Sequence, residues 1–330
     1  MTALKQKKNK APRSVSYSRY GYYFILPFFI VYAVFSLWPL LSTFYYSLFE
    51  YTTRNLKETV SFAGLLNYKK LLGLVEGETP YFLKYLGNTV RIWFFNFVPQ
   101  ILLSLLLAAW LTDNRKKLKA RGLYKIMIYM PNIITAASIS MLFYAFLNQF
   151  GPVMTALRNL GWIAQDANIM TSKWGTSLAI SFILFWMWYG NTTLLLISGM
   201  LGINSSLYEA ADIDGASGWQ KFTRITVPLL KPVLMYVLVT SAIGGLQLYD
   251  IPALFNVSGS IGMPDDTSTT VTMYIMRLYT TDLGRASAVS MLLFVVTMLV
   301  SLVLLYTMRQ TDTLPRRRRH GALKGGHGND

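Results

Sequence analysis

The polar stretch from Glu209 to Pro228 holds the side chains best placed for chemistry, because it interrupts two long apolar runs. It reads EAADIDGASGWQKFTRITVP, and it is too polar to cross a bilayer. Ser206 and Glu209 have the spacing of a capping box, which predicts a first helix over residues 207–214. Gly215 suits the left-handed residue that ends a helix. Glu209 keeps free carboxylate lone pairs even when it caps, so it can also form a salt bridge.

The same spacing recurs at Ser217 and Gln220 and predicts the start of a second helix. Pro228 is predicted to end that helix, since proline has no backbone N–H. Ala210 and Ala211 suit close docking of another surface on the first helix, because small side chains let it approach. Their helix propensity alone is the alternative explanation.

Polar and small residues inside two apolar runs form a second candidate site. Aromatic faces beside hydrogen-bonding groups suit sugars, because the apolar face of a sugar ring stacks and its hydroxyls pair. Tight helix packing is the alternative explanation for the small residues. The candidates are Leu184, Trp188 and Asn191, which share a helix face through their i, i+4, i+7 spacing, then Ser241, Gly244, Gly245 and Leu248, with Gln247 near the outer end of the run.

Two further polar residues lie within predicted spans. An unpaired Asp250 in hydrocarbon would cost about 2.5–3.5 kcal/mol, so we expect it to face a partner, a cavity or the outer surface. Asn96 is interpreted as a contact between helices. The chain has no cysteine and no phosphate-binding P-loop motif, and it has no acidic or histidine cluster with metal-ligand spacing. We therefore predict no catalytic site, no metal and no cofactor bound by this chain.

The composition is that of a membrane protein. Of 330 residues, 53% are hydrophobic and 14% are charged, against about 25% charged in soluble domains. We predict an all-α polytopic fold of six spans, since each run has room for about 20 residues. Pro27 and Pro39 are expected to kink the first span, and the external loop 50–84 is expected to hold one helix at 68–74. The predicted spans are 20–49, 85–111, 126–147, 174–200, 229–255 and 286–308.

Basic residues set the orientation. The net charge is +16, and two of every three Lys and Arg residues fall in segments that share one side when the N-terminus is inside. This bias places both termini and residues 201–228 in the cytoplasm. Arg316 to Arg319 then serve orientation and anionic lipid rather than nucleic acid. The predicted parts are a basic tail 1–19, a permease domain 20–308 containing cytoplasmic loop 201–228, and a flexible basic tail 309–330.

Loop 201–228 resembles the EAA loop in the membrane subunit of binding-protein-dependent ABC importers. Its amino-acid sequence is similar to that of the carbohydrate branch, whose members transport maltose, oligosaccharides and glycerol phosphate. The resemblance covers residues 20–305. The chain departs from the family at Ile203-Asn204, where Ile-Pro is common. The residues that carry the resemblance are Glu209, Ala210, Ala211, Gly215, Ile225 and Pro228.

The resemblance implies a multi-pass permease subunit of a bacterial or archaeal inner or plasma membrane, importing a sugar or oligosaccharide. It implies a second permease, often giving a heterodimer, two ATPase subunits that hold ATP and Mg²⁺, and an external solute-binding protein. The first short helix of the loop would be the coupling helix that docks on the ATPase. The coupling residues would be Glu209, Ala210, Ala211, Asp214 and Gly215.

Two alternatives remain open. A stand-alone secondary transporter would need ionisable coupling groups in several spans, and few acids other than Asp250 lie there. An ABC importer for a solute other than a sugar would share every feature of loop 201–228.

Overall fold

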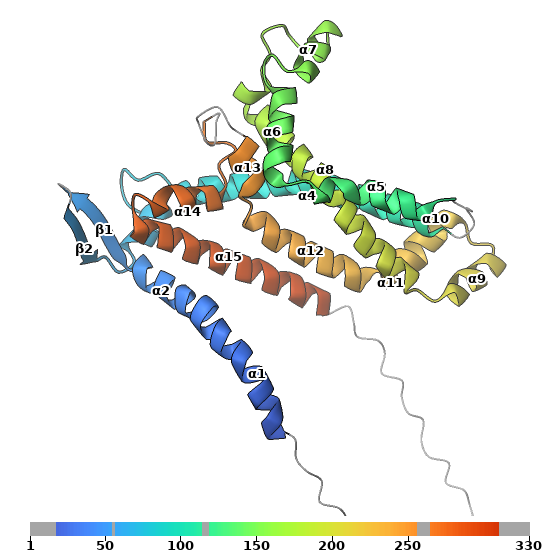
Figure 1. Cartoon of the computed structure of the whole chain (residues 1–330), viewed down its shortest axis with the longest axis horizontal. Helices are drawn as coiled ribbons and strands as arrows, with labels where there is room; N and C mark the ends of the chain where they lie inside the picture. The colour runs from blue at the N-terminus through green and yellow to red at the C-terminus, as the bar shows by residue number, and fades with distance from the viewer. Residues whose placement is uncertain (1–17, 55–56, 114–118, 256–264, 310–330) are drawn as a thin grey trace, which may run out of the picture.

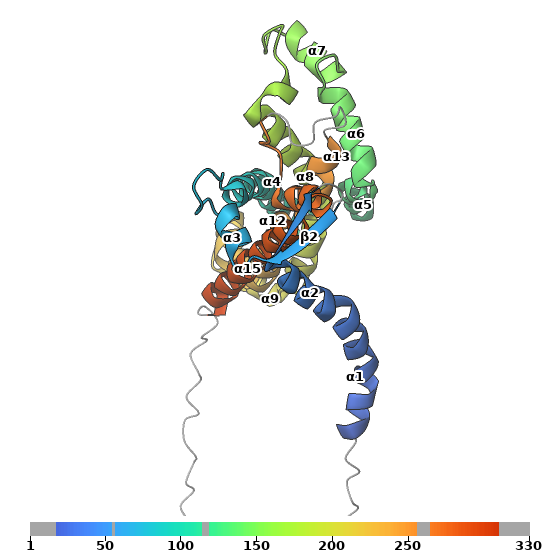
Figure 2. The same cartoon turned by 90° about the vertical axis from the view of Figure 1, so that its left-hand side faces the viewer.

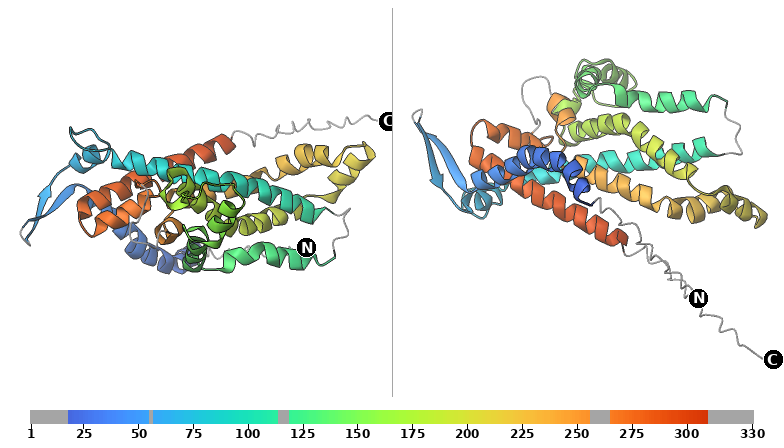
Figure 3. Two further views of the ribbon diagram at one scale, coloured as in Figure 1. Left: turned by 90° about the horizontal axis from the view of Figure 1, so that it is seen from above. Right: turned by 60° about the horizontal axis from the view of Figure 1, so that its bottom comes forward.

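The computed structural model describes residues 18–54, 57–113, 119–255 and 265–309, and these residues are mostly helical. Among them, 4 helices are long and apolar enough to cross a membrane, or up to 6 spans if each of two bent helix pairs is one span. The β-hairpin lies at one end of the molecule and helix α9 (Ser205–Ile213) at the other, as Figures 1 and 3 show. The predicted tails 1–19 and 309–330 lie almost wholly outside these residues.

The first span is one helix of 28 residues, Tyr20–Ser47. Pro27 lies inside its first part, and a π-helical turn precedes Pro39, which has no N–H to continue the ladder. No residue of its most apolar stretch is buried within the chain. The span projects away from the other helices (Figures 1 and 2), so its apolar surface is left for lipid or another subunit. Its segments are α1 (Ser18–Tyr32), η1 (Ala33–Leu37) and α2 (Trp38–Ser47).

The loop predicted at 50–84 is more ordered than expected. Strands β1 (Phe49–Arg54) and β2 (Lys57–Phe62) pair antiparallel, with Phe49 opposite Phe62. Both strands are rich in Thr and aromatic or β-branched residues, which favour strands, and this signal was overlooked. The short helix expected at 68–74 is α3 (Leu66–Leu71).

Helices α4 (Tyr81–Thr112) and α8 (Lys173–Leu201) pack side by side along much of their length and agree with the predicted second and fourth spans. The predicted third span, 126–147, is not a single helix. Helices α5 (Arg121–Ile133) and α6 (Ala136–Leu147) meet at 87°. The break follows Pro131, and the hydroxyl of Thr135 accepts a hydrogen bond from the Ser138 N–H to start α6. Helix α6 and the following α7 (Pro152–Asn159) stand out from the bundle in Figures 1 and 2.

The predicted fifth span, 229–255, is not a single helix either. Three residues, 247–249, lie between the end of α12 (Lys231–Leu246) and the start of α13 (Asp250–Phe255). Helix α15 (Leu283–Arg309) forms the sixth span as expected. Three separate apolar clusters hold the bundle together, centred on Tyr85, Ile180 and Leu196. The remaining elements are η2 (Ile169–Thr171), α10 (Gly218–Lys221), η3 (Phe222–Thr226), α11 (Val227–Leu229) and α14 (Val271–Tyr279).

Candidate functional site

Loop 201–228 folds as two helical segments, as predicted, but it starts differently. The side chain of Asn204, not Ser206, caps α9 by accepting the Ser206 N–H at 3.1 Å. The Asn at the position of the family's proline therefore supplies the cap, and the predicted Ser206–Glu209 capping box is wrong. Gly215 has φ +71 and ends α9 as expected.

The second segment has the predicted capping box. Ser217 accepts the backbone N–H of Gln220, and the Gln220 side chain accepts the N–H of Ser217. Pro228 does not end this segment, as it was predicted to do. It sits in the first turn of α11, where its missing N–H costs nothing, and the chain bends by 65° just after, before Lys231.

Two polar contacts join the helical segments of the loop. The ammonium of Lys221 pairs with the Asp212 carboxylate, and the lysine is only 7% exposed. The hydroxyls of Tyr208 and Thr226 lie 2.9 Å apart. Because each contact joins α9 to the segment after Gly215, the loop is braced to move as one unit.

Replacing Asp212 with Ala should loosen this brace. The pair is expected to contribute about 1 kcal/mol, because the Asp212 side chain is half exposed to solvent. Hydrogen–deuterium exchange in α9 and α10 should then be roughly fivefold faster. Asp214→Ala is the matched control, since the Asp214 carboxylate forms no ion pair with the described residues. Equal exchange in the two variants would contradict the brace.

The predicted coupling residues lie on the surface of the loop. Glu209, Ala210, Asp214 and Gly215 are exposed, and Ala211 is partly exposed. The Glu209 carboxylate forms no hydrogen bond or ion pair with the described residues, so it is free to pair with another subunit. Sequence reasoning missed two apolar residues of the same loop, Ile213 and Trp219, which are 88% and 70% exposed. Large apolar residues in an otherwise polar loop are the sequence feature that would have indicated them.

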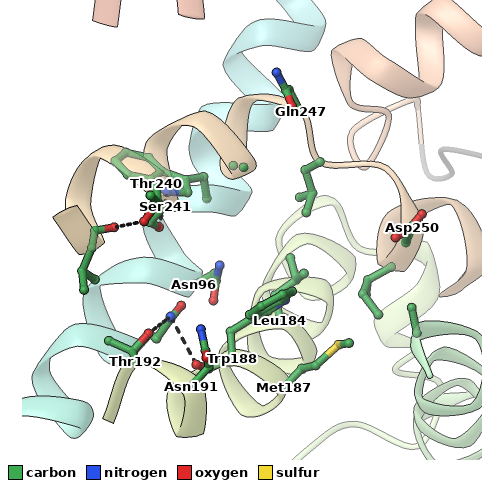
Figure 4. A pocket seen from close by; sticks show the side chains of 18 of the residues that line it. Asn96, Leu184, Met187, Trp188, Asn191, Thr192, Thr240, Ser241, Gln247 and Asp250 are labelled. Atoms are coloured by element: carbon green, nitrogen blue, oxygen red, sulfur yellow. Dashed lines mark hydrogen bonds between the residues drawn. The ribbon is translucent and has the colours of Figure 1, made fainter. Parts of the chain in front are cut away.

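A cavity of about 400 Å³ opens between α4, α8 and α12 (Figure 4). All eight predicted pathway residues line it: Leu184, Trp188, Asn191, Ser241, Gly244, Gly245, Gln247 and Leu248. The position of Leu248 in the cavity wall differs from the one predicted from the sequence. It lies after the end of α12 rather than on the same helix face as Ser241.

The two glycines of α12 have different roles in this wall. The indole N–H of Trp93 donates to the Ser241 hydroxyl at 3.0 Å, which brings the ring against α12. A Cβ on Gly245 would lie 2.1 Å from the Trp93 ring, so Gly245 is needed for helix packing. A Cβ on Gly244 would meet nothing within 4 Å, so Gly244 leaves open space.

Helix α4 supplies residues that sequence reasoning missed or misread. Gln100 donates to the Thr192 hydroxyl at 2.7 Å, which fixes its amide at the cavity wall. Asn96 also lines the cavity, although it was interpreted as a contact between helices. It is 8% exposed, and its Oδ1 has no hydrogen-bond partner among the described residues. Asn96 therefore leaves a buried acceptor unpaired at the cavity, a place where a ligand hydroxyl or water would be favourable.

The chemistry of the cavity is neutral and polar with an aromatic wall. Trp188 is 43% exposed, and the Asn191 amide forms no hydrogen bond with the described residues. Asp250 lines the cavity too, at the start of α13, which is one of the three environments expected for it. Figure 4 shows Asn96, Trp188 and Asn191 close together, with Gln247 and Asp250 apart from them. Such a site can stack a ring and hydrogen-bond hydroxyls.

A second hollow of about 660 Å³ lies on the other side of the break in the fifth span. Helices α14 and α15 line it, and their polar members are Thr272, Ser290, Thr297 and Ser301. Gln247 lines both hollows, so they adjoin at the break after α12.

Comparison with known proteins identifies the class. Residues 84–317 match the family described as binding-protein-dependent transport system inner membrane component. The lactose transport system permease protein LacF of Rhizobium radiobacter is 31% identical, over 88% of this chain and 94% of LacF. The arabinooligosaccharides transport system permease protein AraP of Bacillus subtilis (strain 168) is 32% identical, over 90% of this chain and 91% of AraP.

The chain belongs to this family of inner-membrane permease components. Its fold is similar to that of a chain in the crystal structure of a bacterial ABC transporter involved in the import of the acidic polysaccharide alginate. The TM-score is 0.74 at 20% sequence identity, over 90% of this chain and 98% of that chain. Family membership favours the importer over the stand-alone secondary transporter that the sequence had left open, and it assigns the chain to the transport path rather than to catalysis.

Proposed function

We propose that this chain is the permease subunit of an ATP-driven importer for a sugar or oligosaccharide. The observation that carries the proposal is the cavity, in which the exposed Trp188 ring lies near the unpaired amides of Asn96 and Asn191. An indole face stacks on the apolar face of a sugar ring, and amides pair with its hydroxyls. Relatives named for lactose, arabinooligosaccharide and trehalose/maltose transport support the same substrate class.

The proposed complex contains a second permease, two ATPase subunits and an external solute-binding protein. The uncovered first span leaves a large apolar surface for lipid or the second permease. Loop 201–228 exposes Glu209, Ile213 and Trp219, and so offers charged and apolar side chains to an ATPase. A likeness in fold to the alginate transporter in complex with its periplasmic protein supports the external partner.

The proposed mechanism couples loop 201–228, which joins α8 to the segments before α12, with the cavity that lies farther along these two helices. ATP and Mg²⁺ bind to the ATPase subunits, and closure of these subunits moves loop 201–228. Because contacts across Gly215 brace the loop, its movement is passed to α8 and α12, the helices on either side of it. These helices carry the cavity walls, so the cavity is opened to one side of the membrane at a time.

Gentle purification of the chain from its native membrane, with mass spectrometry of the proteins that accompany it, tests the proposal. We expect an ATPase with a P-loop and a second permease, and we expect ATPase stimulation by a sugar with its binding protein. Recovery of the chain alone, still transporting in vesicles without ATP, would contradict it. Stimulation by a solute that is not a sugar would leave the importer standing and overturn the substrate class.

A further inference from the structure

The break in the fifth span leaves backbone groups without their usual helix partners. The N–H of Gln247 still bonds to the Ile243 carbonyl at 3.2 Å, and the helix then stops. The next helix begins at Asp250. Backbone at membrane depth has to be satisfied by other protein groups, because hydrocarbon supplies no hydrogen bonds.

A single side chain binds a carbonyl of this break. The hydroxyl of Thr270 donates to the Leu248 carbonyl at 2.6 Å. The hydroxyl oxygen of Thr270 also accepts the N–H of Met273 at 3.3 Å and caps α14. Thr270 is fully buried, so water does not replace either bond.

Helix α4 holds Thr270 in place through the segment in front of it. The Asn88 amide donates to the carbonyls of Asp266 and Thr269, and the Arg91 guanidinium donates to the carbonyl of Thr267. The hydroxyl of Thr89 accepts the N–H of Val271 at 3.1 Å, directly after Thr270. Residues 267–270 are all buried.

This segment therefore links two walls of the cavity. Helix α4 carries Trp93, Asn96 and Gln100 on its next turns, and the break carries Gln247 and Leu248. The hydrogen bond from the Thr270 hydroxyl to the Leu248 carbonyl joins residues 267–270 to the break. No role was predicted from the sequence for residues 267–270, Thr-Ser-Thr-Thr.

We propose that Thr270 is a positioning residue of the transport cavity. By holding the Leu248 carbonyl, it sets the orientation of Gln247 and Leu248 relative to the α4 wall. The role of the cavity in sugar transport rests on the proposed function above, whereas the geometry of the break does not.

The test compares Thr270→Val, which has a similar shape without the hydroxyl, with Thr270→Ser, which keeps it. Thr193→Val is the matched control. Its hydroxyl is equally buried but bonds, among the residues that the structure describes, to the Tyr189 carbonyl inside α8, and Thr193 is not among the residues that line the cavity. All variants are studied in the complete complex purified from the membrane.

The first readout needs no knowledge of the substrate. The chain has no cysteine, so Leu248→Cys would carry the only thiol of this subunit. We expect Thr270→Val to change the labelling rate of that thiol with a hydrophilic maleimide by about tenfold, as loss of a buried hydrogen bond would allow. Thr270→Ser and Thr193→Val should leave the rate unchanged. An unchanged rate in Thr270→Val overturns the inference.

The second readout is transport with the binding protein and sugar. We expect Thr270→Val to raise the KM by about tenfold while the amount of assembled complex stays the same, and Thr270→Ser to restore it. Equal loss of assembled complex in both Thr270 variants, with KM unchanged, would mean that Thr270 only stabilises the fold. A wild-type complex that transports no sugar would refute the proposed substrate while the thiol labelling still tests Thr270.

Discussion

Replacing Gly244 with Leu is expected to reduce transport at least about tenfold, a change of about 1.4 kcal/mol in the free energy of the transport step. Gly244 lines the cavity, and a Cβ there would meet nothing within 4 Å, so the backbone and neighbours tolerate a side chain. The larger side chain would fill space that the substrate is proposed to use. Assembly of the complex should be unaffected, because leucine is also the better helix former.

Gly87→Leu is the matched control for this prediction. Gly87 lies in α4, is exposed and likewise has nothing within 4 Å of an added Cβ, but it does not line the cavity. Uptake of radiolabelled sugar into vesicles, at equal amounts of complex, measures the difference. Normal transport by Gly244→Leu would show that substrate does not pass this side of the cavity.

Reversing the charge of Glu209 should uncouple the ATPase from transport. The carboxylate is exposed and has no partner among the described residues, so its proposed partner lies on the ATPase. Loss of one member of an interface charge pair costs about 2–5 kcal/mol. We therefore expect Glu209→Lys to lower sugar-dependent ATPase activity and transport by at least tenfold, with the chain still inserted in the membrane.

Glu76→Lys is the control, because Glu76 is an exposed acid in the loop predicted to lie on the opposite side of the membrane. Co-purification of the ATPase should fall for Glu209→Lys and remain for Glu76→Lys. Full transport by Glu209→Lys would remove Glu209 from the coupling surface. A matching loss in both variants would point to a general effect of added positive charge.

Local chemistry made several features predictable from the sequence. The Ser217 capping box and the left-handed Gly215 depend only on residues a few positions away, and both have the expected geometry. The i, i+4, i+7 spacing of Leu184, Trp188 and Asn191 placed them on one face, and the structure brings them to one cavity. Their role in binding substrate stays a prediction.

Competition between neighbouring caps limited other predictions. Both Asn204 and Ser206 are able to cap α9, and spacing alone favoured Ser206 because of Glu209. The structure uses Asn204, which leaves the Glu209 carboxylate free. Apolar runs likewise indicate a length that can span a membrane but not where a helix breaks, so the 87° bend near Ile134 was missed.

The sequence by itself determined the membrane class, the long helices and the polar loop 201–228, because composition and periodicity are local properties of the chain. Only the tertiary structure decided what Asn96, Trp93 and Thr270 do. Trp93 acts through Ser241, more than a hundred positions away, and Asn96 acts through a cavity that exists only after folding. The partner of Thr270, the Leu248 carbonyl, is closer in sequence but also depends on the tertiary structure. The two meet because α12 stops at Leu246 and α4 holds residues 267–270 against the break.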